Sequence, residues 1–220
     1  MRNHGAALAV LAVAVLGVAC GGDEKGVVDQ YFNAVKAKDN QTLSSFSSVT
    51  FDKPVESWKI TATSEEQKAP LTAPDLSAKV RELEGQISQN QKDARANIDA
   101  AQVEEVKALR RAGKAVPANL QASAAAFDKA THQDGELKKQ LAQTKAELEK
   151  ERRAMTKSVG QLDSVDGITG QVLSKTVDVD LSMKDEKPAP YVMTLRRYEL
   201  QREGPRSVSR WVVTDIKPRS

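Results

Sequence analysis

Apolar residues in the first part of the chain follow a helical period and then a strand period. Over residues 27–35 they recur at steps of one, three and four, which predicts an amphipathic helix, and a second short helix is expected over residues 41–47. Over residues 58–62 apolar and polar residues alternate, which predicts a strand. Residues 63–74 are polar, contain two prolines and are therefore expected to form a linker.

The central part of the chain is rich in Ala, Gln, Glu, Lys and Leu, which are strong helix formers. Pro117 is the only proline in residues 75–187, and together with Gly113 it marks a turn. The segments before and after this turn, 75–113 and 117–157, have nearly equal lengths. They predict an antiparallel coiled-coil hairpin whose arms are on the order of 60 Å long, at about 1.5 Å per residue.

The spacing of apolar residues differs between the two arms of this hairpin. The second arm keeps the alternating three- and four-residue spacing of a coiled coil from Leu120 to Met155. In the first arm the large apolar residues recur every eleven residues, which favours a straight or slightly right-handed coil. If the turn sets the register, Asn97 lies opposite Asp134, and we interpret Asp134 as a structural residue that fixes the register.

The C-terminal part returns to the strand period. Alternation over residues 177–183 and 191–195 predicts two strands, and the change of apolar parity at Tyr198 predicts a β-bulge at Arg196-Arg197. Residues 203–207 are expected to close a second hairpin into a last strand. With the strand near residue 58, these elements form a four-stranded antiparallel sheet.

The order of these elements predicts an α+β fold. A small antiparallel-sheet domain, residues 27–62 and 168–220, is expected to pack on the two N-terminal helices. Residues 72–158 form the coiled-coil hairpin inserted into it. Eight of the nine aromatic residues lie outside the hairpin, so the sheet domain is expected to hold the main core.

Composition excludes several classes of function. The 33 Lys and Arg residues nearly balance the 30 Asp and Glu residues along the 220-residue chain, so the concentrated basic surface of a nucleic-acid binder is absent. A mean hydropathy of −0.50 argues against a polytopic membrane protein. We therefore expect no nucleic-acid partner.

The first residues of the chain resemble an export signal. Arg2 is followed by an uncharged run of mostly Ala, Val and Leu up to Ala19, which is typical of a signal peptide over residues 1–19 and is short for a permanent membrane anchor. The run ends in Leu16-Gly17-Val18-Ala19-Cys20, which resembles the lipobox of bacterial lipoproteins, although Gly17 stands where that family prefers Leu.

This resemblance implies that Cys20 becomes the first residue of the mature chain and carries lipid, with ordinary secretion and a free Cys20 as the alternative. The protein would then be anchored to a membrane of the bacterial cell envelope and face the periplasm or the cell exterior. Gly21, in place of an aspartate, slightly favours the outer over the inner membrane. Residues 20–26 are expected to form a flexible lipidated tether.

Few residues of the mature chain offer catalytic chemistry. It keeps one cysteine and one histidine, His132, which excludes an internal disulfide, Cys/His zinc sites and Cys-His nucleophile pairs. Asp178 and Asp180 share one face of a strand, but Asp178 is expected to pair with Arg196 across the hairpin rather than to hold a cation. We expect no catalytic residues, no metal and no cofactor.

The sheet domain resembles the nuclear transport factor two-like superfamily, an α+β cone of helices against a curved sheet. The segments that carry the resemblance are Val28–Asp39, similar to the opening helix of that family, and Ser209–Ile216, similar to its last strand. The inserted hairpin departs from the family pattern. The resemblance implies that the mouth of the cone could bind or convert a small molecule, but no family catalytic residue can be matched in this chain.

Three hypotheses about function remain open. The first is a non-enzymatic envelope lipoprotein whose coiled-coil hairpin contacts a protein partner or acts as a spacer. The second is a small-molecule-binding or catalytic cone, and the third is an adaptor in an envelope transport assembly. Basic residues make the hairpin tip the candidate partner contact for the first hypothesis, and the predicted contact residues are Arg110, Arg111, Lys114 and Asn119.

Overall fold

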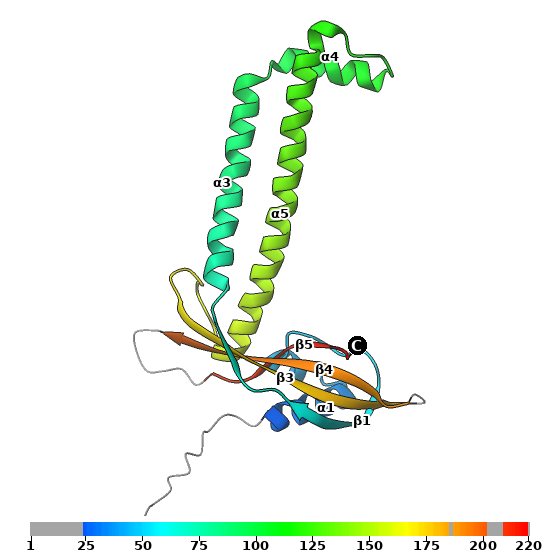
Figure 1. Cartoon of the computed structure of the whole chain (residues 1–220), viewed down its shortest axis with the longest axis vertical. Coiled ribbons are helices and arrows are strands. Elements are labelled where there is room, and N and C mark those ends of the chain that lie inside the picture. The colour runs from blue at the N-terminus through cyan, green and yellow to red at the C-terminus, as the bar shows by residue number, and fades with distance from the viewer. Residues whose placement is uncertain (1–23, 185–186, 202–208, 220) are drawn as a thin grey trace, which may run out of the picture.

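The computed structural model describes residues 24–184, 187–201 and 209–219 (Figure 1). Its helices and strands form a mixed α+β fold, as the periodicity predicted, with one antiparallel sheet of five strands. In chain order the elements are α1 (Glu24–Ala37), α2 (Asn40–Phe46), β1 (Val55–Thr63), β2 (Gln67–Pro70), α3 (Ala73–Asn97), α4 (Ala100–Arg111), η1 (Ala118–Leu120), α5 (Gln121–Val159), β3 (Thr169–Met183), β4 (Ala189–Gln201) and β5 (Val212–Pro218).

The sheet has the order β1-β3-β4-β5, and β2 pairs with the first half of β3 while β1 pairs with the second half. The expected linker over residues 63–74 is therefore wrong in part, because residues 67–70 form β2 opposite residues 171–174. All four residues of β2 are exposed, so no apolar alternation marks this strand in the sequence. Its proline lies at the strand end on the sheet edge, where a missing N–H donor costs no ladder hydrogen bond.

The two faces of the sheet have different covers. Helices α1 and α2 pack on one face, where the odd-numbered residues of β3 from Val177 to Met183 are buried. Tyr198 belongs to the opposite face and is buried beneath the end of α5. The apolar residues of β4 therefore change from odd-numbered to even-numbered positions, because the buried face of the strand changes from the α1 side to the α5 side.

The predicted bulge at Arg196-Arg197 is wrong, because β3 and β4 pair without a break and the irregularity lies between Thr194 and Leu195 on the β5 side.

The β3–β4 hairpin is also registered differently from the prediction. Asp178 lies opposite Val192 rather than Arg196. The Asp178 carboxylate instead accepts a hydrogen bond from the Arg219 guanidinium at 2.7 Å. The expected Asp178–Arg196 pair is therefore wrong, and Arg196 is available to the helix on the other face of the sheet.

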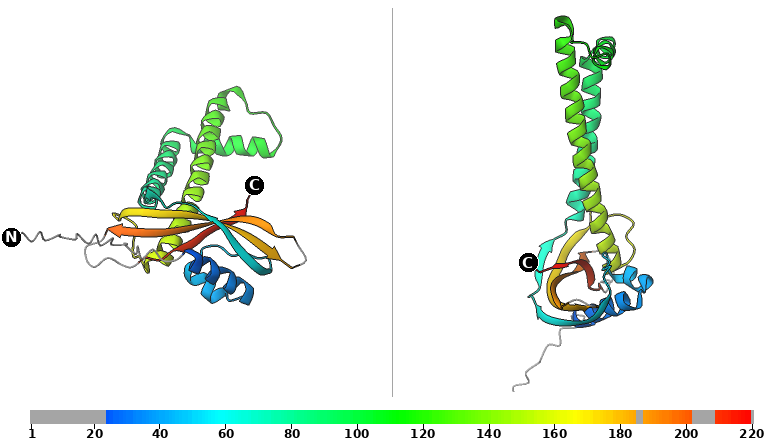
Figure 2. Two further views of the ribbon diagram at one scale, coloured as in Figure 1. Left: turned by 60° about the horizontal axis from the view of Figure 1, so that its bottom comes forward. Right: turned by 90° about the vertical axis from the view of Figure 1, so that its right-hand side faces the viewer.

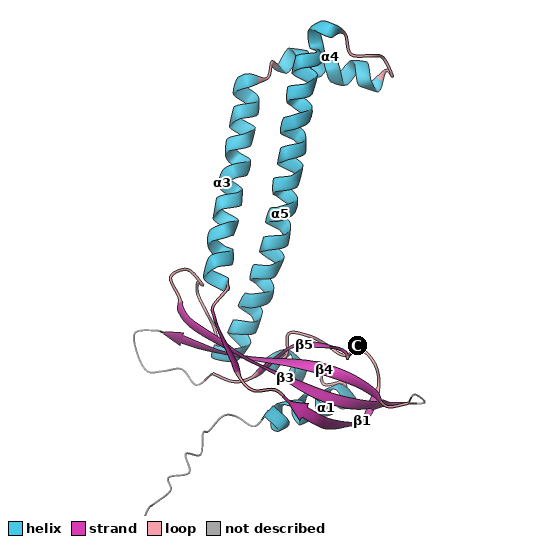
Figure 3. Ribbon diagram, in the orientation of Figure 1, coloured by secondary structure: helices cyan, strands magenta, loops and turns pink. Residues whose placement is uncertain are grey.

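Helices α3 and α5 lie antiparallel and side by side and project from the sheet, and we call this pair the arm (Figures 1 and 3). The predicted continuous first helix over residues 75–113 is wrong. Ile98 is extended, and the Asp99 carboxylate caps a new helix by accepting from the N–H groups of Ala101 and Gln102. Aspartate is among the strongest N-cap residues, so local capping outweighs helix propensity here. Helix α4 turns sideways at the end of the arm (Figure 2).

The break shifts the register of the arm. Gln91, not Asn97, donates to the Asp134 carboxylate, at 3.1 Å, and Asn97 donates to the Asp93 carbonyl in its own helix. Lys138 pairs with Asp134 from the next turn of α5 at 2.6 Å. The predicted Asn97–Asp134 layer is wrong because α4 uses residues that the prediction assigned to the straight arm.

Helix α1 begins at Glu24, so residues 24–26 are helical and do not belong to the flexible tether expected over residues 20–26. The signal segment, Cys20 and the expected second hairpin turn at residues 203–207 lie outside the described residues. Within the described ranges, no helix combines the length and apolar character that a membrane crossing requires.

Candidate functional site

The arm meets the sheet in a contact that we call the arm root. Leu71 and Ala73, before and at the start of α3, and Met155, near the end of α5, are buried with Val172 and Tyr198 of the sheet. The arm root is thus a second apolar cluster, on the face of the sheet opposite α1. The remaining buried members of the cluster are Leu148, Ala154 and Val165.

A charged pair in the arm root joins a buried glutamate to a partly exposed arginine. Glu151 of α5 is only 6% exposed, and its carboxylate accepts from the Arg196 guanidinium of β4 at 2.9 Å. Burial raises the pKa of the neighbouring Tyr198 hydroxyl, and the Glu151 charge raises that pKa further. Removing Arg196 would leave the buried Glu151 charge uncompensated, so this pair ties α5 to β4.

Hydrogen bonds to the backbone tie the end of α5 to two further elements. The Ser158 hydroxyl donates to the Arg210 carbonyl at 2.7 Å and accepts from the Tyr198 N–H at 3.1 Å. The Arg210 guanidinium donates to the carbonyls of Lys157 and Ser45, both at 2.7 Å. Helix α2, the end of α5 and the start of β5 are therefore joined through one arginine.

The beginning of α3 is held as well. The Ser77 hydroxyl and the Arg81 guanidinium both donate to the Asp166 carboxylate, at 2.7 and 2.8 Å. These hydrogen bonds lower the pKa of Asp166, and the bond from Ser77 has the larger effect. Both helices are therefore attached at the arm root. A tilt of the arm relative to the sheet domain would break these contacts.

Residues 98–120 connect α3 to α5 at the far end of the arm, and we call this segment the arm tip. Val106 and Leu120 of the arm tip form a small core with Ala124 of α5. Both terminal nitrogens of Arg110 donate to the Asp128 carboxylate, at 2.6 and 2.7 Å, and this contact lowers the pKa of Asp128. The pair fixes α4 against α5, so α4 is held in place by specific contacts.

The structure places the four predicted contact residues together at the arm tip. One of them is paired within the protein and the other three are not. Arg110 is engaged with Asp128 and has a structural role. Arg111, Lys114 and Asn119 are exposed, and within the described residues their side chains make no hydrogen bond or ion pair. Gly113, with φ +66, supplies the turn between them. These three side chains are available to a partner.

The space between α1 and the sheet is filled by side chains. Phe32 lies edge-on to Tyr31 and Phe51, at centroid distances of 5.2 and 6.4 Å, and against Trp58 at 5.4 Å. Tyr191 closes this group by packing on Phe51. An open groove of about 550 Å³ remains beside this core, between the first turns of α1 and the end of β1.

Among the described residues, no cluster of three or more His, Cys, Asp or Glu side chains could hold a metal ion. Asp134, interpreted as structural, lies within the arm and bonds Gln91 and Lys138. Sequence reasoning missed the arm root. A charged residue, Glu151, at a coiled-coil seam position was the available signal, whereas Arg210 gave none because it bonds to backbone carbonyls.

No protein-family model, curated protein or solved structure matches this chain.

Proposed function

We propose that the protein is a non-enzymatic lipoprotein of the bacterial cell envelope that uses its coiled-coil hairpin, inserted into a nuclear transport factor two-like sheet domain, to hold a protein partner at a distance from the membrane. The observation that carries this proposal is an arm fastened at its root and exposed at its tip. A rigid attachment lets a distant contact be held at a defined position.

The arm root supports a positioning role. The Glu151–Arg196 pair and the bonds of Ser158 and Arg210 connect the end of α5 to β4, α2 and β5. The bonds of Asp166 fasten α3. An arm that served only as a flexible connection would not need polar contacts from both helices to the base.

The arm tip supports contact with a protein. Arg111, Lys114 and Asn119 offer exposed polar groups on a short segment that Arg110 and Asp128 hold in place. Arginine is enriched at the points of protein interfaces that contribute most to binding. The sequence near Cys20 supports the membrane end, because several acyl chains on one residue anchor a protein stably, whereas one chain is marginal.

Shortening the arm tests the proposal. Residues 85–91 of α3 and 137–143 of α5 are deleted together, which removes one heptad from each helix and shortens the arm by about 10 Å. We expect loss of partner crosslinking in cells while tryptophan fluorescence of the sheet domain is unchanged. Unchanged partner contact would contradict the proposal.

A second variant separates contact from spacing. Arg111, Lys114 and Asn119 are replaced by Ala in the full-length arm. Loss of the partner in both variants indicates a contact made by the arm tip. Loss only in the shortened variant indicates that the length of the arm, and hence a spacer role, is what matters.

A further inference from the structure

Three cationic side chains lie close together where the end of α5 contacts α2 and the start of β5. Arg153 and Lys157 are four residues apart and therefore share one face of α5, and Arg210 lies just before β5. The Lys157 ammonium donates to the Ser44 carbonyl of α2, and the Arg210 guanidinium donates to the carbonyls of Lys157 and Ser45. We call Arg153, Lys157 and Arg210 the cationic cluster.

No carboxylate balances the cationic cluster within the described residues. None of its three side chains forms an ion pair there, whereas Lys175 of β3 pairs with Glu24. Burial lowers the pKa of Lys157, and the charges of Arg153 and Arg210 lower that pKa further. The three positive charges therefore repel one another.

The backbone offsets only part of this charge. Lys157 and Arg210 bond to carbonyls at the C-terminal ends of α2 and α5. Each helix end carries at most about half a negative charge, so three cations leave a surplus of about two positive charges. Arg153 is exposed, and in the described part of the chain its side chain makes no hydrogen bond or ion pair. Like charges four residues apart destabilise a helix, so Arg153 and Lys157 weaken α5 unless an anion joins them.

The chemistry of the donors favours a phosphate group as this anion. A guanidinium presents N–H donors in one plane that match two oxygens of a phosphate, and an ammonium adds a compact positive charge. A phosphate monoester carries a charge of about −1.5 to −2 at pH 7, which matches the surplus. A carboxylate carries a single negative charge and would leave part of the surplus unbalanced.

We propose that the cationic cluster binds a phosphate group, with two hydrogen bonds from Arg153 and with Lys157 and Arg210 supplying the remaining charge. Inorganic phosphate, a soluble phosphomonoester and the headgroup of phosphatidic acid share this chemistry. The site goes beyond the proposed function and depends neither on the lipid anchor nor on the protein partner.

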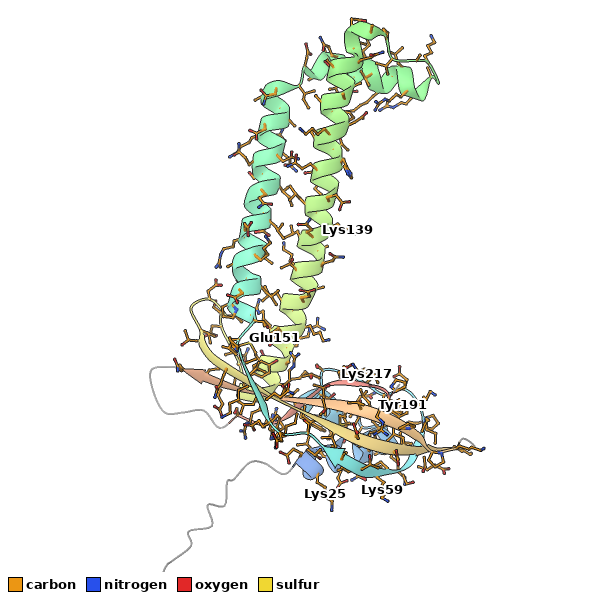
Figure 4. All side chains as sticks on the ribbon, viewed as in Figure 1. Lys25, Lys59, Lys139, Glu151, Tyr191 and Lys217 are labelled. Carbon is orange, nitrogen blue, oxygen red and sulfur yellow. The ribbon has the colours of Figure 1, made fainter. Side chains whose placement is uncertain are left out.

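A bound phosphate strengthens the attachment of the arm. Its ligands come from α5 and from the residue that joins α5 to α2 and β5, so the anion holds these elements together. Figure 4 shows Glu151 at the base of the arm, two residues before Arg153, and Lys139 farther up α5. We expect phosphate to slow hydrogen exchange in the last turns of α5 and to leave exchange around Lys139 unchanged.

NMR signals of the arginine side chains test the site directly. Inorganic phosphate is added to the purified, nitrogen-15-labelled protein at constant ionic strength, with chloride as the balancing anion. We expect the Nε–H signal of Arg153 to shift and to saturate. The signal of Arg95, an exposed arginine of α3, should stay in place.

Vesicles distinguish the source of the phosphate. Phosphatidylcholine vesicles with and without phosphatidic acid are added to a second sample. A response of Arg153 to inorganic phosphate assigns the site to a soluble ligand, and a response only to phosphatidic acid assigns it to a lipid headgroup. No response to either probe, or an equal response of Arg95, overturns the proposal.

A pair of charge variants identifies the binding residue. Arg153→Gln removes an exposed side chain without an internal partner, so the variant should fold normally. It is expected to weaken phosphate binding about tenfold, as the loss of a charge-assisted hydrogen bond does. Lys139→Gln removes the same charge from an exposed position of α5 and is expected to leave binding unchanged.

Thermal unfolding in increasing phosphate compares the two variants. Phosphate also stabilises proteins without binding, because it is excluded from their surface. This contribution is common to both variants, so the difference between them reports the site. Equal stabilisation of Arg153→Gln and Lys139→Gln overturns the proposal.

Discussion

The sheet domain and the arm differ in how much of their structure is buried. In the sheet domain, Tyr31, Phe32, Leu181 and Met193 are fully buried within one continuous core. In α3, by contrast, the only buried residues are Ala73 at its start and Leu83, and most buried residues of α5 lie from Leu148 onward, close to the sheet.

Most of the stability of the molecule therefore comes from the sheet domain. Burial of apolar surface is the main favourable contribution to folding, so the sheet domain folds around its own core. The part of the arm beyond Leu83 of α3 and Leu148 of α5, which we call the outer arm, buries little surface, and its stability depends on the contact between the two helices and on the arm root. We therefore expect the outer arm to open locally while the sheet stays folded.

The largest effect is expected from a core residue of the sheet domain. Phe32→Ala removes a ring that contacts three other aromatic side chains and should lower the free energy of unfolding by about 3–5 kcal/mol. Phe127→Ala, the matched change in the half-buried seam of the arm, should cost much less. Urea unfolding of both variants checks the difference, and equal costs would contradict the comparison.

The next effect concerns the seam of the arm. Leu83 is 1% exposed, and Leu83→Ala should cost about 2–5 kcal/mol by opening a cavity between α3 and α5. Hydrogen exchange should accelerate in the middle of both helices and stay unchanged in β3. Leu137→Ala, at a half-buried seam position, is the control with a smaller expected effect. Faster exchange in β3 would show that arm and sheet unfold as one unit.

A smaller effect is expected at the arm root. Glu151→Gln removes the charge that pairs with Arg196 and should cost about 1–3 kcal/mol, because Arg196 is partly exposed and recovers some hydration. Glu149→Gln breaks an exposed pair with Arg152 one turn away and should change stability by less than about 1 kcal/mol. Thermal unfolding measures the stability of both variants. Equal stabilities would contradict a stabilising role for the Glu151–Arg196 pair.

The smallest effect is a pH dependence confined to the arm. Hydrogen bonds from Lys138 and then Gln91 lower the pKa of Asp134 below its ordinary value near 3.9. The stabilisation is therefore complete above about pH 4 and is lost as the pH falls through the lowered folded-state pKa. The side-chain amide signals of Gln91 should shift over that acidic range in NMR spectra. In Asp134→Asn this shift should disappear, and its persistence would assign it to another group.

Periodicity was a good guide where one face of an element is buried. It predicted α1, β1, β3 and the α+β class because alternating or helical apolar spacing reflects a single covered face. It failed for β2, whose residues are all exposed, and at Tyr198, where the cover changes from one face of β4 to the other. It also missed the helix end at Ile98, which a capping aspartate next in the chain determines.

The candidate sites were less predictable for a related reason. The exposed tip residues Arg111, Lys114 and Asn119 could be located once the turn at Gly113 was recognised. The arm root depends on contacts between residues far apart in the chain, such as Glu151 with Arg196 and Arg210 with Lys157. No local pattern encodes these contacts, so only the folded chain reveals them.

The most direct test of the central claim, that the arm tip is the working surface, is photo-crosslinking in living cells. A photoreactive residue at Lys114 probes the arm tip, and one at Lys217 probes the sheet as a matched exposed position. We predict a discrete crosslinked partner from Lys114 that is absent from Lys217. Crosslinks from Lys217 alone, or from neither position, would contradict the claim.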